Sequence, residues 1–272
     1  MDDISKIYEE IEDNLKFVAT SGVRIKMMAN LLEKPKTSTQ LKDELGVGAS
    51  TVIHAARDME KEKILIEKTD GYHLTAIGKI ITLKLLEMIK TIYMVEKSKD
   101  FWVRHLIDGI PEEFISNIHM IYNHELLTSS IRNVFKTLSI YLEITKKAKV
   151  FYGVSPVFVD AFVSMVTKLL KRGTKVHLVI TEEVFEELKN IDKEGLKRIL
   201  ENQNLSLFVT QEMPTVAFTV TDTAFSLGLF GEDGIYDPTQ DLISFDKEAI
   251  KWGRDLFEYY KSRARKVNSG EV

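Results

Sequence analysis

The sequence predicts a protein of mixed α+β and α/β class, with a small helical domain first and an α/β sandwich domain second. Three observations support this prediction. A length of 272 residues favours two domains over one. The first third of the chain has helical periodicity and ends in a hairpin pattern, whereas short apolar strands alternate with helical segments from residue 149 onward.

Three helices are predicted before Gly46. Residues 4–17 place apolar side chains at helical spacing, with acidic side chains opposite. Residues 22–33 form a second helix that ends near Pro35, because the residue before a proline is disfavoured in the α region. The third helix begins at Thr37, whose spacing to Gln40 is that of a capping box.

A fourth helix and a β-hairpin complete the first domain. The helix starts at Gly48 and runs to Lys63, and the segment ILIEKTDGYHLT then alternates apolar and polar residues around Asp70-Gly71, a dipeptide typical of tight hairpins. Helix, short helix, turn, helix and hairpin is the order of a winged helix-turn-helix. The following residues 76–97 are apolar over more than half of a helix circumference, which implies a partner.

The second domain begins with a βαβ pattern. Strand 149–153, helix 156–171 and strand 175–180 predict a parallel strand pair. A helix at 182–202, four short strands and a closing helix at 246–265 follow; the strands are LSLFVTQ, TVAFTVTD, AFSLGLF and DLISF. We therefore expect a winged helix-turn-helix with flanking dimerisation helices at 1–97, a helical connector with an edge strand at 98–148, and a regulatory α/β domain, for an effector or for assembly, at 149–265.

Composition limits the class of protein and its location. Apolar residues make up 44% and charged residues 29%, as in folded soluble proteins. With no cysteine, the chain has no disulfide or thiolate site, and we expect a cytoplasmic protein. The acidic N-terminus predicts no signal peptide, and no segment is apolar enough to predict a membrane partner. The net charge of −4 hides a mildly basic region, since residues 20–90 hold twelve Lys or Arg against nine acids.

The fourth helix has two faces of different chemistry. An apolar set recurs at i, i+3, i+4 and i+7 and predicts the core face: Val52, Ala55, Ala56 and Met59. A second set at the same spacing, shifted by two positions, faces away and carries hydroxyl, imidazole and guanidinium groups that suit phosphates and base edges. The residues predicted to contact double-stranded DNA are Ser50, Thr51, Ile53, His54 and Arg57 on this helix, with Lys68 and His73 beside the hairpin tip. The alternative is a solvated polar face on a helical domain that binds no DNA.

Several segments resemble known regulators. LKDELGVGASTVIHAARDMEKEKILIEKTDGYHLTAIG resembles the winged-helix domain of archaeal regulators related to the ArsR type. FWVRHLIDGIP, with Phe101, Trp102, His105 and Pro111, and the ending FSLGLFGEDGIYDPTQDLISFDKEAIKWGRDLFEYY resemble the C-terminal domain of the methanogenesis-regulator family of methane-producing archaea. The resemblance implies a cytoplasmic, homodimeric, DNA-binding transcription regulator. It also implies a second domain akin to half of a phospholipase-D-like fold and to sugar-sensing archaeal regulators.

No enzyme activity is predicted. Phospholipase-D-like chemistry needs a His nucleophile with a Lys two residues on and an Asp six residues on, but His177 is followed by Leu178, Val179 and Ile180. His119 and His124 fail the same test.

No cofactor or metal site is predicted either. DPTQDLISFDKE carries acids at calcium-loop spacing, but Leu242 stands where the loop needs Gly, so we interpret these acids as turn formers and Asp246 as a helix N-cap.

A small-molecule effector site is expected where strands of the second domain end, since open α/β sheets bind ligands there. The candidate residues are Tyr152, Ser155, Asp222, Thr223 and Tyr236. The function hypothesis is a homodimeric transcription regulator whose fourth helix enters successive major grooves and whose second domain senses a small molecule. The alternative is a protein-protein interaction scaffold built on a winged helix that does not bind DNA.

Overall fold

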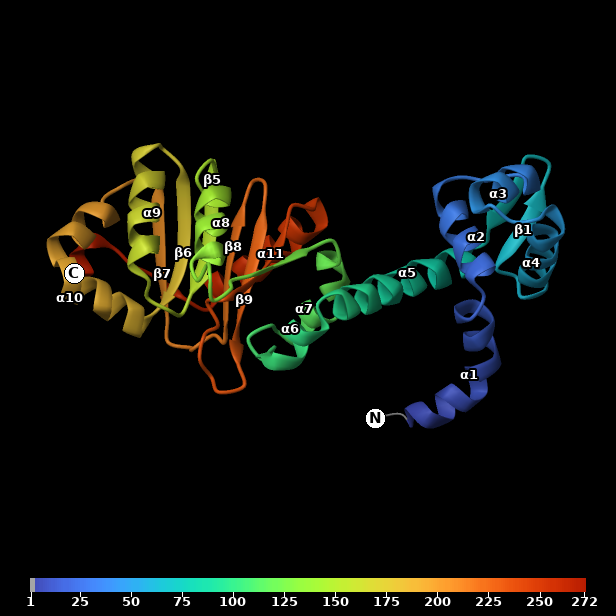
Figure 1. Ribbon diagram of the computed structural model, residues 1–272, viewed down its shortest axis with the longest axis horizontal. Helices are drawn as coiled ribbons and strands as arrows, with labels where there is room; N and C mark the ends of the chain where they lie inside the picture. The colour runs from blue at the N-terminus through green and yellow to red at the C-terminus, as the bar shows by residue number, and fades with distance from the viewer. Residues whose placement is uncertain (1–2) are drawn as a thin grey trace. The chain divides into compact units, whose positions relative to one another are not determined.

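The computed structural model describes residues 3–272, which divide into two units, one ending at Ile89 and the other spanning Lys90–Val272 (Figure 1). The first unit is mostly helical with one hairpin, and the second is built on a large sheet with helices on both faces. This is the mixed α and β class that the sequence predicts. Among the described helices, none has the length and apolar character needed to span a bilayer.

Four helices open the first unit, namely α1 (Ile4–Ala19), α2 (Gly22–Glu33), α3 (Ser38–Leu45) and α4 (Ala49–Lys61). The capping box at α3 is confirmed, because Thr37 Oγ1 accepts the Gln40 N–H and the Gln40 side chain accepts the Thr37 N–H. Gly46 ends α3 in the left-handed conformation, at φ 65°, which glycine adopts without steric cost. Helices α2, α3 and α4 then pack around Met27, Met28, Leu41, Val52 and Met59.

The hairpin is confirmed, with β1 (Leu65–Lys68) antiparallel to β2 (Gly71–Leu74). Its loop is Thr69–Asp70, one position earlier than the expected Asp70-Gly71, because Gly71 pairs with Lys68. Gly71 has φ +125°, and a Cβ there would lie 2.5 Å from the Lys36 carbonyl oxygen. The glycine therefore lets β2 form its bridge to the segment before α3, in which the Tyr72 N–H donates to Lys36 O at 2.9 Å.

Helix α5 (Ala76–Lys97) begins in the first unit and ends in the second. Its start is fixed to the segment before β1, since Thr75 Oγ1 donates to the Lys63 carbonyl at 2.6 Å and accepts the Gly78 N–H at 3.0 Å. A Cβ on Gly78 would lie 1.9 Å from the Ile64 carbonyl oxygen. Only glycine fits this close approach of helix and strand.

Residues 98–148 contain six short elements and belong to the second unit. They are α6 (Lys99–Arg104), β3 (His105–Leu106), α7 (Glu112–Ile115), η1 (Ile118–Ile121), β4 (Glu125–Thr128) and α8 (Lys136–Thr145). We expected a connector with an edge strand, and β4 does lie at the sheet edge. Phe101, Ile110 and Ile121 are nevertheless in the main core of the unit, so these residues are more than a connector. Five of these six elements have only two to six residues, which is too short to produce a recognisable period.

The βαβ unit is confirmed, with β5 (Val150–Ser155), α9 (Asp160–Lys171) and β6 (Lys175–Thr181) in that order, and β5 parallel to β6. Helix α9 starts at residue 160 rather than at the expected 156, because residues 156–159 form a loop after β5. The remaining elements are α10 (Glu182–Leu200), β7 (Leu205–Thr210), β8 (Val216–Thr221), β9 (Phe225–Gly231), β10 (Gln240–Ser244), α11 (Lys247–Ser262), β11 (Arg265–Lys266) and η2 (Ser269–Glu271).

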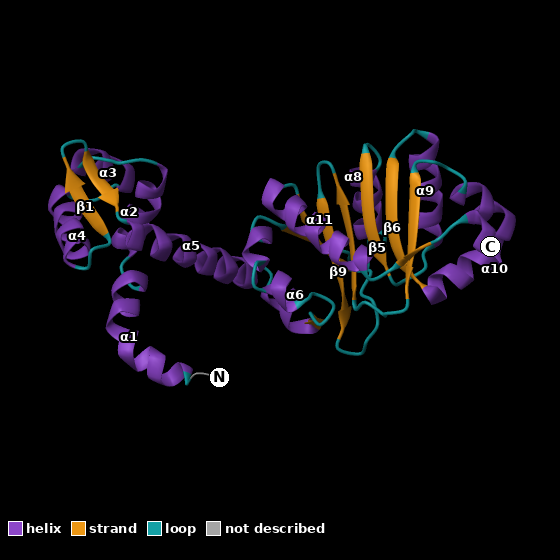
Figure 2. Cartoon of the chain, turned by 180° about the vertical axis from the view of Figure 1, so that it is seen from behind, coloured by secondary structure: helices purple, strands orange, loops and turns teal. Residues whose placement is uncertain are grey.

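The large sheet has nine strands in the order β11-β7-β6-β5-β8-β9-β10-β4, with β3 paired to β9. Strands β5, β6 and β7 are parallel, and the others pair antiparallel. Helices α8 and α9 cover one face and α11 covers the other, as the front and back views show (Figures 1 and 2). The α11 face is filled by large side chains, among them Phe225, Trp252 and Phe257.

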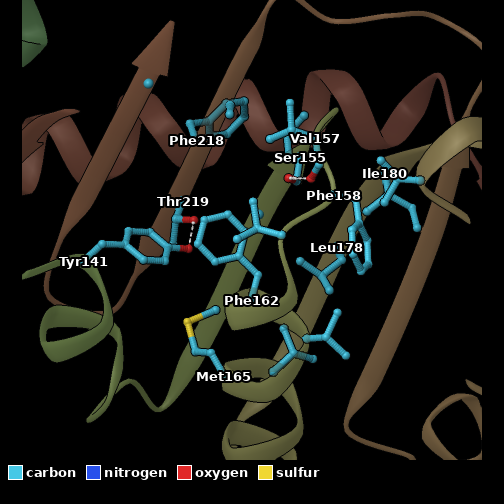
Figure 3. Close-up of a pocket in the computed structure, with 18 of the residues that line it drawn as sticks. Tyr141, Ser155, Val157, Phe158, Phe162, Met165, Leu178, Ile180, Phe218 and Thr219 are labelled. Atoms are coloured by element: carbon cyan, nitrogen blue, oxygen red, sulfur yellow. Dashed lines mark hydrogen bonds between the residues drawn. The ribbon is translucent and has the colours of Figure 1, made fainter. Parts of the chain in front are cut away.

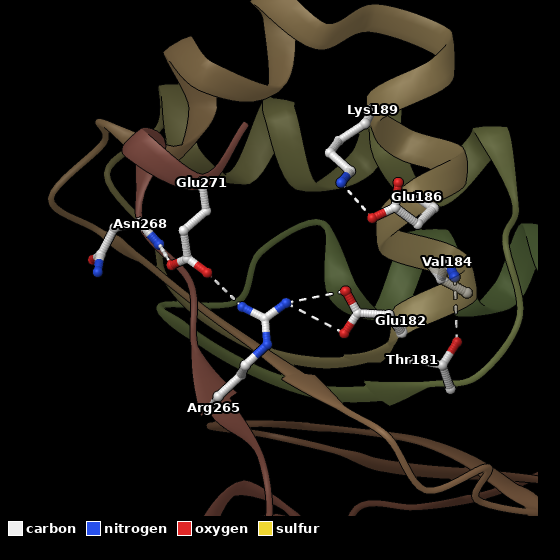
Figure 4. Close-up of polar contacts among 8 residues, drawn as sticks. All are labelled: Thr181, Glu182, Val184, Glu186, Lys189, Arg265, Asn268 and Glu271. Carbon is white, nitrogen blue, oxygen red and sulfur yellow. Dashed lines mark hydrogen bonds and ion pairs between the residues drawn. The ribbon is translucent and has the colours of Figure 1, made fainter.

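The two edges of this sheet are formed by short strands, β4 and the two-residue β11. Arg265 of β11 donates to both carboxylate oxygens of Glu182, at 3.0 and 3.2 Å, and to Glu271 at 2.5 Å (Figure 4). Its Nη2 thus contacts Glu182 and its Nη1 contacts Glu271, and these charge-assisted hydrogen bonds on two nitrogens hold the guanidinium group in one orientation. They fix the last strand against the start of α10.

Candidate functional site

Helix α4 presents one buried and one exposed face, as its sequence predicts. Val52, Ala55, Ala56 and Met59 are all buried, which confirms the predicted core face. The other set points outward: Ser50, Thr51, His54 and Arg57 are exposed, and Ile53 is half-buried. The core fixes the rotation of the helix, and this fixes which side chains can meet a ligand.

The first turn of α4 leaves its backbone donors available. Gly48 precedes the helix and supplies no side-chain cap. The N–H groups of a first helical turn have no partner within the helix, and together with the helix dipole they favour an anion such as phosphate. Ser50 and Thr51, exposed in that turn, add two hydroxyl groups.

The acidic end of α4 is tied to the hairpin. The Glu60 carboxylate accepts the Glu67 N–H of β1 at 2.9 Å. Burial raises the pKa of Tyr72, and the charges of Glu67 and Glu60 raise it further while the positive charge of Arg57 lowers it. The structure thus joins the C-terminal end of α4 to the hairpin.

The two residues predicted at the hairpin tip differ in their availability. Lys68 is exposed at the end of β1. His73 is half-buried, and its Nε2 lies 2.7 Å from Asp70 Oδ1. This hydrogen bond lowers the pKa of the Asp70 carboxyl group. His73 already has an anionic partner, so Lys68 is the more available of the two for a phosphate.

The second unit contains a cavity of about 220 Å³ between the sheet and the helices α8, α9 and α10 (Figure 3). On β5, β8 and β9 part of its sheet wall consists of small residues in register on neighbouring strands. Gly153 pairs with Thr219 and Thr219 with Ser226, while Ala217 pairs with Gly228. Because strand side chains alternate between faces, the large residues of β8 and β9 lie on the opposite, α11 side. The cavity exists because this face of three strands lacks side-chain volume.

A polar cluster lies on the wall of this otherwise apolar cavity. The Tyr141 hydroxyl and Thr219 Oγ1 are 2.8 Å apart (Figure 3). The Ser226 hydroxyl donates to Asp241 Oδ2 at 2.7 Å, whereas Asp241 Oδ1 is buried and has no hydrogen-bond partner. Burial raises the pKa of Asp241 to about 7, and it also raises the pKa values of Tyr141 and Tyr236.

The five residues predicted for an effector site are separated by the structure. Ser155 and Tyr236 line the cavity. Tyr152 alternates to the opposite face of β5, where its ring stacks on His177 and lies beside Phe257 of α11. Asp222 and Thr223 form the β8–β9 turn, where Asp222 accepts the Lys149 N–H at 2.8 Å. These three residues are not among those that line the cavity.

Five polar residues of the cavity were not predicted from the sequence, namely Thr137, Tyr141, Thr219, Ser226 and Asp241. Asp241 had been assigned to a turn, but it lies in β10 and is 5% exposed. One signal for these residues is present in the sequence: within AFSLGLF, the small residues Ser226 and Gly228 alternate with large apolar residues. Such a pattern leaves one strand face without bulk.

Two family models match this chain. Residues 12–93 match the N-terminal domain of the methanogenesis regulatory protein FilR1, and residues 134–263 match the middle domain of the same protein. The curated protein of that name from Methanothrix harundinacea (strain 6Ac) is 29% identical over 265 residues, which are 95% of this chain and 59% of the relative. The chain thus spans about 59% of the length of the curated relative it matches.

Two solved structures show weaker likeness. TrmBL2, described as an archaeal chromatin protein with a novel mode of DNA binding, covers 89% of this chain and 92% of its own at 13% identity and a TM-score of 0.44. The phosphatidylserine synthase of Haemophilus influenzae Rd KW20 covers 55% of this chain and 41% of its own at 12% identity and a TM-score of 0.41. The ArsR-like and phospholipase-D-like resemblances stay predictions.

Proposed function

We propose that this chain, a FilR1-type methanogenesis regulatory protein by both of its domain matches, is a DNA-binding transcription regulator rather than an enzyme. One observation carries the proposal. Helix α4 buries its apolar face and leaves Ser50, His54 and Arg57 exposed, and the end of the helix is hydrogen-bonded to the hairpin through Glu60. This is the geometry that a helix needs to enter a major groove with its polar side chains toward the bases.

Each exposed group on α4 has a distinct use in such a complex. Arg57 can donate two hydrogen bonds to a guanine or bind a phosphate, and the hydroxyl groups of Ser50 and Thr51 can donate to phosphates at the start of the helix. Ile53 can meet a thymine methyl group. Lys68 and His73 add contacts from the hairpin, the stronger one expected from Lys68. Because so few cations are involved, the dependence of affinity on salt should be shallow.

A homodimer would place two copies of α4 in successive grooves, with the second units biasing the half-site spacing. Charge and apolar surface support a pairing of α1 from one copy with α5 from the other. The exposed large apolar residues are Ile4, Ile7, Tyr8, Ile11 and Leu15 on α1, and Ile77, Ile80, Leu83, Met88, Ile89, Ile92 and Tyr93 on α5. Helix α1 carries four acids against two Lys, and α5 carries four Lys against two Glu, so the two helices have opposite net charge.

The dimer proposal is tested with Ile7→Asp combined with Ile11→Asp, and sedimentation equilibrium measures the mass. We expect a monomer, because two charges on the apolar stripe of α1 would oppose burial. Ile131→Asp is the matched control, since Ile131 is 99% exposed in the second unit. Unchanged dimer mass in the double variant would contradict the use of α1.

The DNA proposal is tested with Arg57→Ala on a fragment from upstream of the protein's own gene. Loss of a bidentate guanine contact weakens specific binding by about ten- to a hundred-fold, equivalent to about 1–3 kcal/mol. Lys171→Ala is the control, because it removes one exposed cation from the second unit. Equal affinity of wild type and Arg57→Ala would contradict the proposal that this face of α4 binds DNA. The absence of any footprint would favour the scaffold function, in which the first unit binds a protein.

We further propose that the second unit senses a small molecule. Its cavity supports this role, because protein interiors are normally packed to the density of organic crystals and leave few voids larger than a water molecule. Ser155 and Tyr236 are the two predicted effector residues that this site would use. The proposed regulator therefore has an outward-facing DNA site and an inward-facing ligand site. It is proposed to act in the cytoplasm.

A further inference from the structure

We infer that the cavity of the second unit binds a small molecule with an apolar body and one protonated amine, and that the ammonium group pairs with Asp241. This inference names the ligand class for the sensing role proposed above and rests on that role. It does not depend on DNA binding by the first unit.

The shape of the cavity sets the size and the polarity of the ligand. At about 220 Å³ it is larger than an apolar protein cavity of about 150 Å³ that accepts benzene. Most of its wall is aliphatic or aromatic, including Phe158, Phe162, Met165 and Leu178 (Figure 3). A molecule with a single ring and a short side chain fits these limits.

The charge of the wall determines which polar group the ligand can carry. Of the residues that line the cavity, all within the described chain, Asp241 is the one carboxylic acid, and none is Lys, Arg or His. A carboxylate or phosphate would therefore find no cationic partner and would face a like charge. A cation would find both a carboxylate and several aromatic rings, among them Tyr141, Phe162 and Tyr236, which attract cations through their π faces.

One carboxylate oxygen of Asp241, Oδ1, can accept a hydrogen bond from a bound ligand. Its side chain lies on the cavity side of β10, since Leu242, the next residue, packs into the core on the α11 side. Ser226 donates to Oδ2 at 2.7 Å, which holds the carboxyl group in place, and the backbone amide of Leu227 also lowers the pKa of this carboxyl group. Oδ1 has no hydrogen-bond partner among the described residues, although Asp241 is only 5% exposed. Buried acceptors in native proteins are normally paired. An ammonium group in the cavity provides three donors for this oxygen and its surroundings.

The pairing should depend on pH. The groups that face Asp241 are Ser226 from β9, Tyr141 from α8 and Tyr236 from the segment before β10, and none of them is a base. Burial raises the pKa of Asp241 to about 7 in the empty site. The carboxylate form binds the ammonium, so amine affinity should fall as pH drops below about 7.

The experiment uses three probes of nearly equal shape, 2-phenylethylamine, 2-phenylethanol and phenylacetate, titrated into the full chain by calorimetry at pH 8. We expect the amine to bind at least ten-fold more tightly than the alcohol, and phenylacetate to give no measurable binding. In Asp241→Asn we expect the amine to lose this advantage while the alcohol binds as before. Equal binding of phenylacetate and amine, or an unchanged amine affinity in Asp241→Asn, would overturn the inference, as would no binding of any probe.

A second variant keeps the test decisive if Asp241→Asn does not fold. Ala217→Leu adds volume to the cavity and leaves the Asp241 carboxylate in the chain, so it should abolish binding of the amine and the alcohol alike. Retained amine binding in Ala217→Leu would place the amine outside the cavity and overturn the inference. Arg57→Ala, which tests the DNA site, should bind the amine like wild type. A failure of amine binding with normal DNA binding, or the reverse, therefore identifies which proposal is wrong.

Discussion

The two units carry their candidate sites in opposite ways. In the first unit the core of α2, α3 and α4 is filled, with Met28, Leu41 and Met59 each 0% exposed, and the candidate side chains stand outside it. In the second unit the α11 face is filled in the same way, but the face below α8 and α9 is left open, and the candidate side chains line the opening. Stability and binding should therefore be separable in the first unit and coupled in the second. The predictions below test that difference, beginning with the largest expected effect.

Replacing one buried methionine in each unit by alanine compares how tightly the two interiors are packed. Met28→Ala should lower the free energy of unfolding of the first unit by about 2–5 kcal/mol, because the side chain is surrounded by a filled core. Met165→Ala, at the cavity wall, should cost the second unit less, about 2 kcal/mol or below, since part of its surface faces an open space. Hydrogen exchange measures the first unit, and the fluorescence of Trp102 and Trp252, both in the second unit, measures the other. Equal costs would mean that the two interiors are packed alike.

Asp241→Asn should stabilise the second unit in a pH-dependent manner. The pKa of Asp241 is raised by burial from 3.8 to about 7, so the folded state holds a proton that the unfolded state has released between these values. Stability is therefore greatest below pH 4, falls as pH rises to about 7, and is flat above it. A shift of about three units corresponds to about 4 kcal/mol as an upper limit at pH 8. Tryptophan fluorescence in urea at pH 4.5 and pH 8 measures the effect, and an equal change at both pH values would contradict it.

Replacing either of two alanines by valine should change the free energy of unfolding of the second unit, but with opposite signs. Ala217→Val adds volume to the cavity wall on a strand, where a β-branched residue is favoured, and should stabilise the second unit by about 0.5–1 kcal/mol. Ala249→Val enlarges a residue that is 0% exposed in the filled α11 face and should destabilise it by about 1–3 kcal/mol. Thermal unfolding followed by tryptophan fluorescence compares the two. Destabilisation by both substitutions would mean that the cavity is not open to added volume.

His54→Ala should have the smallest effect on stability. His54 is exposed on α4, so the free energy of unfolding of the first unit should change by less than about 0.5 kcal/mol. Affinity for the upstream DNA fragment should nevertheless fall several-fold, because one donor to the groove is lost. Circular dichroism and gel-shift titration give the two values. A large loss of stability with unchanged DNA affinity would contradict the proposal that His54 serves DNA binding and not the stability of the first unit.

The outward-facing site could be predicted closely from the sequence, and the inward-facing one could not. On α4 one periodic pattern fixes the buried side and thereby the exposed one, so Ser50 and Arg57 follow from Val52 and Met59. The cavity depends on Gly153, Thr219 and Ser226 meeting across three strands, and their register is set by pairing between distant segments. Tyr152 was expected at a strand end, but it lies inside β5 with its side chain on the face opposite the cavity.

Local sequence signals also explain which predicted helix boundaries were right and which were wrong. The capping box at Thr37 and the left-handed Gly46 delimit α3 by contacts within a few residues. By contrast, α9 starts at Asp160 without a side-chain cap, so its sequence gave no signal for the start. The loop of residues 156–159 before it contributes Val157 and Phe158 to the cavity wall, and this late start is part of what shapes the site.

The short charged edges of the large sheet have a further consequence for the protein in a crowded cell. An exposed, long edge strand offers unpaired backbone groups on which other chains can add strands, which leads to aggregation. Here one edge is a two-residue strand of Arg265 and Lys266, with Arg265 held by Glu182 and Glu271, and the other is a four-residue strand that begins with Glu125. Neither edge offers a long uncharged template, so copies of this protein should resist polymerising through their sheets, and self-association is left to the helices.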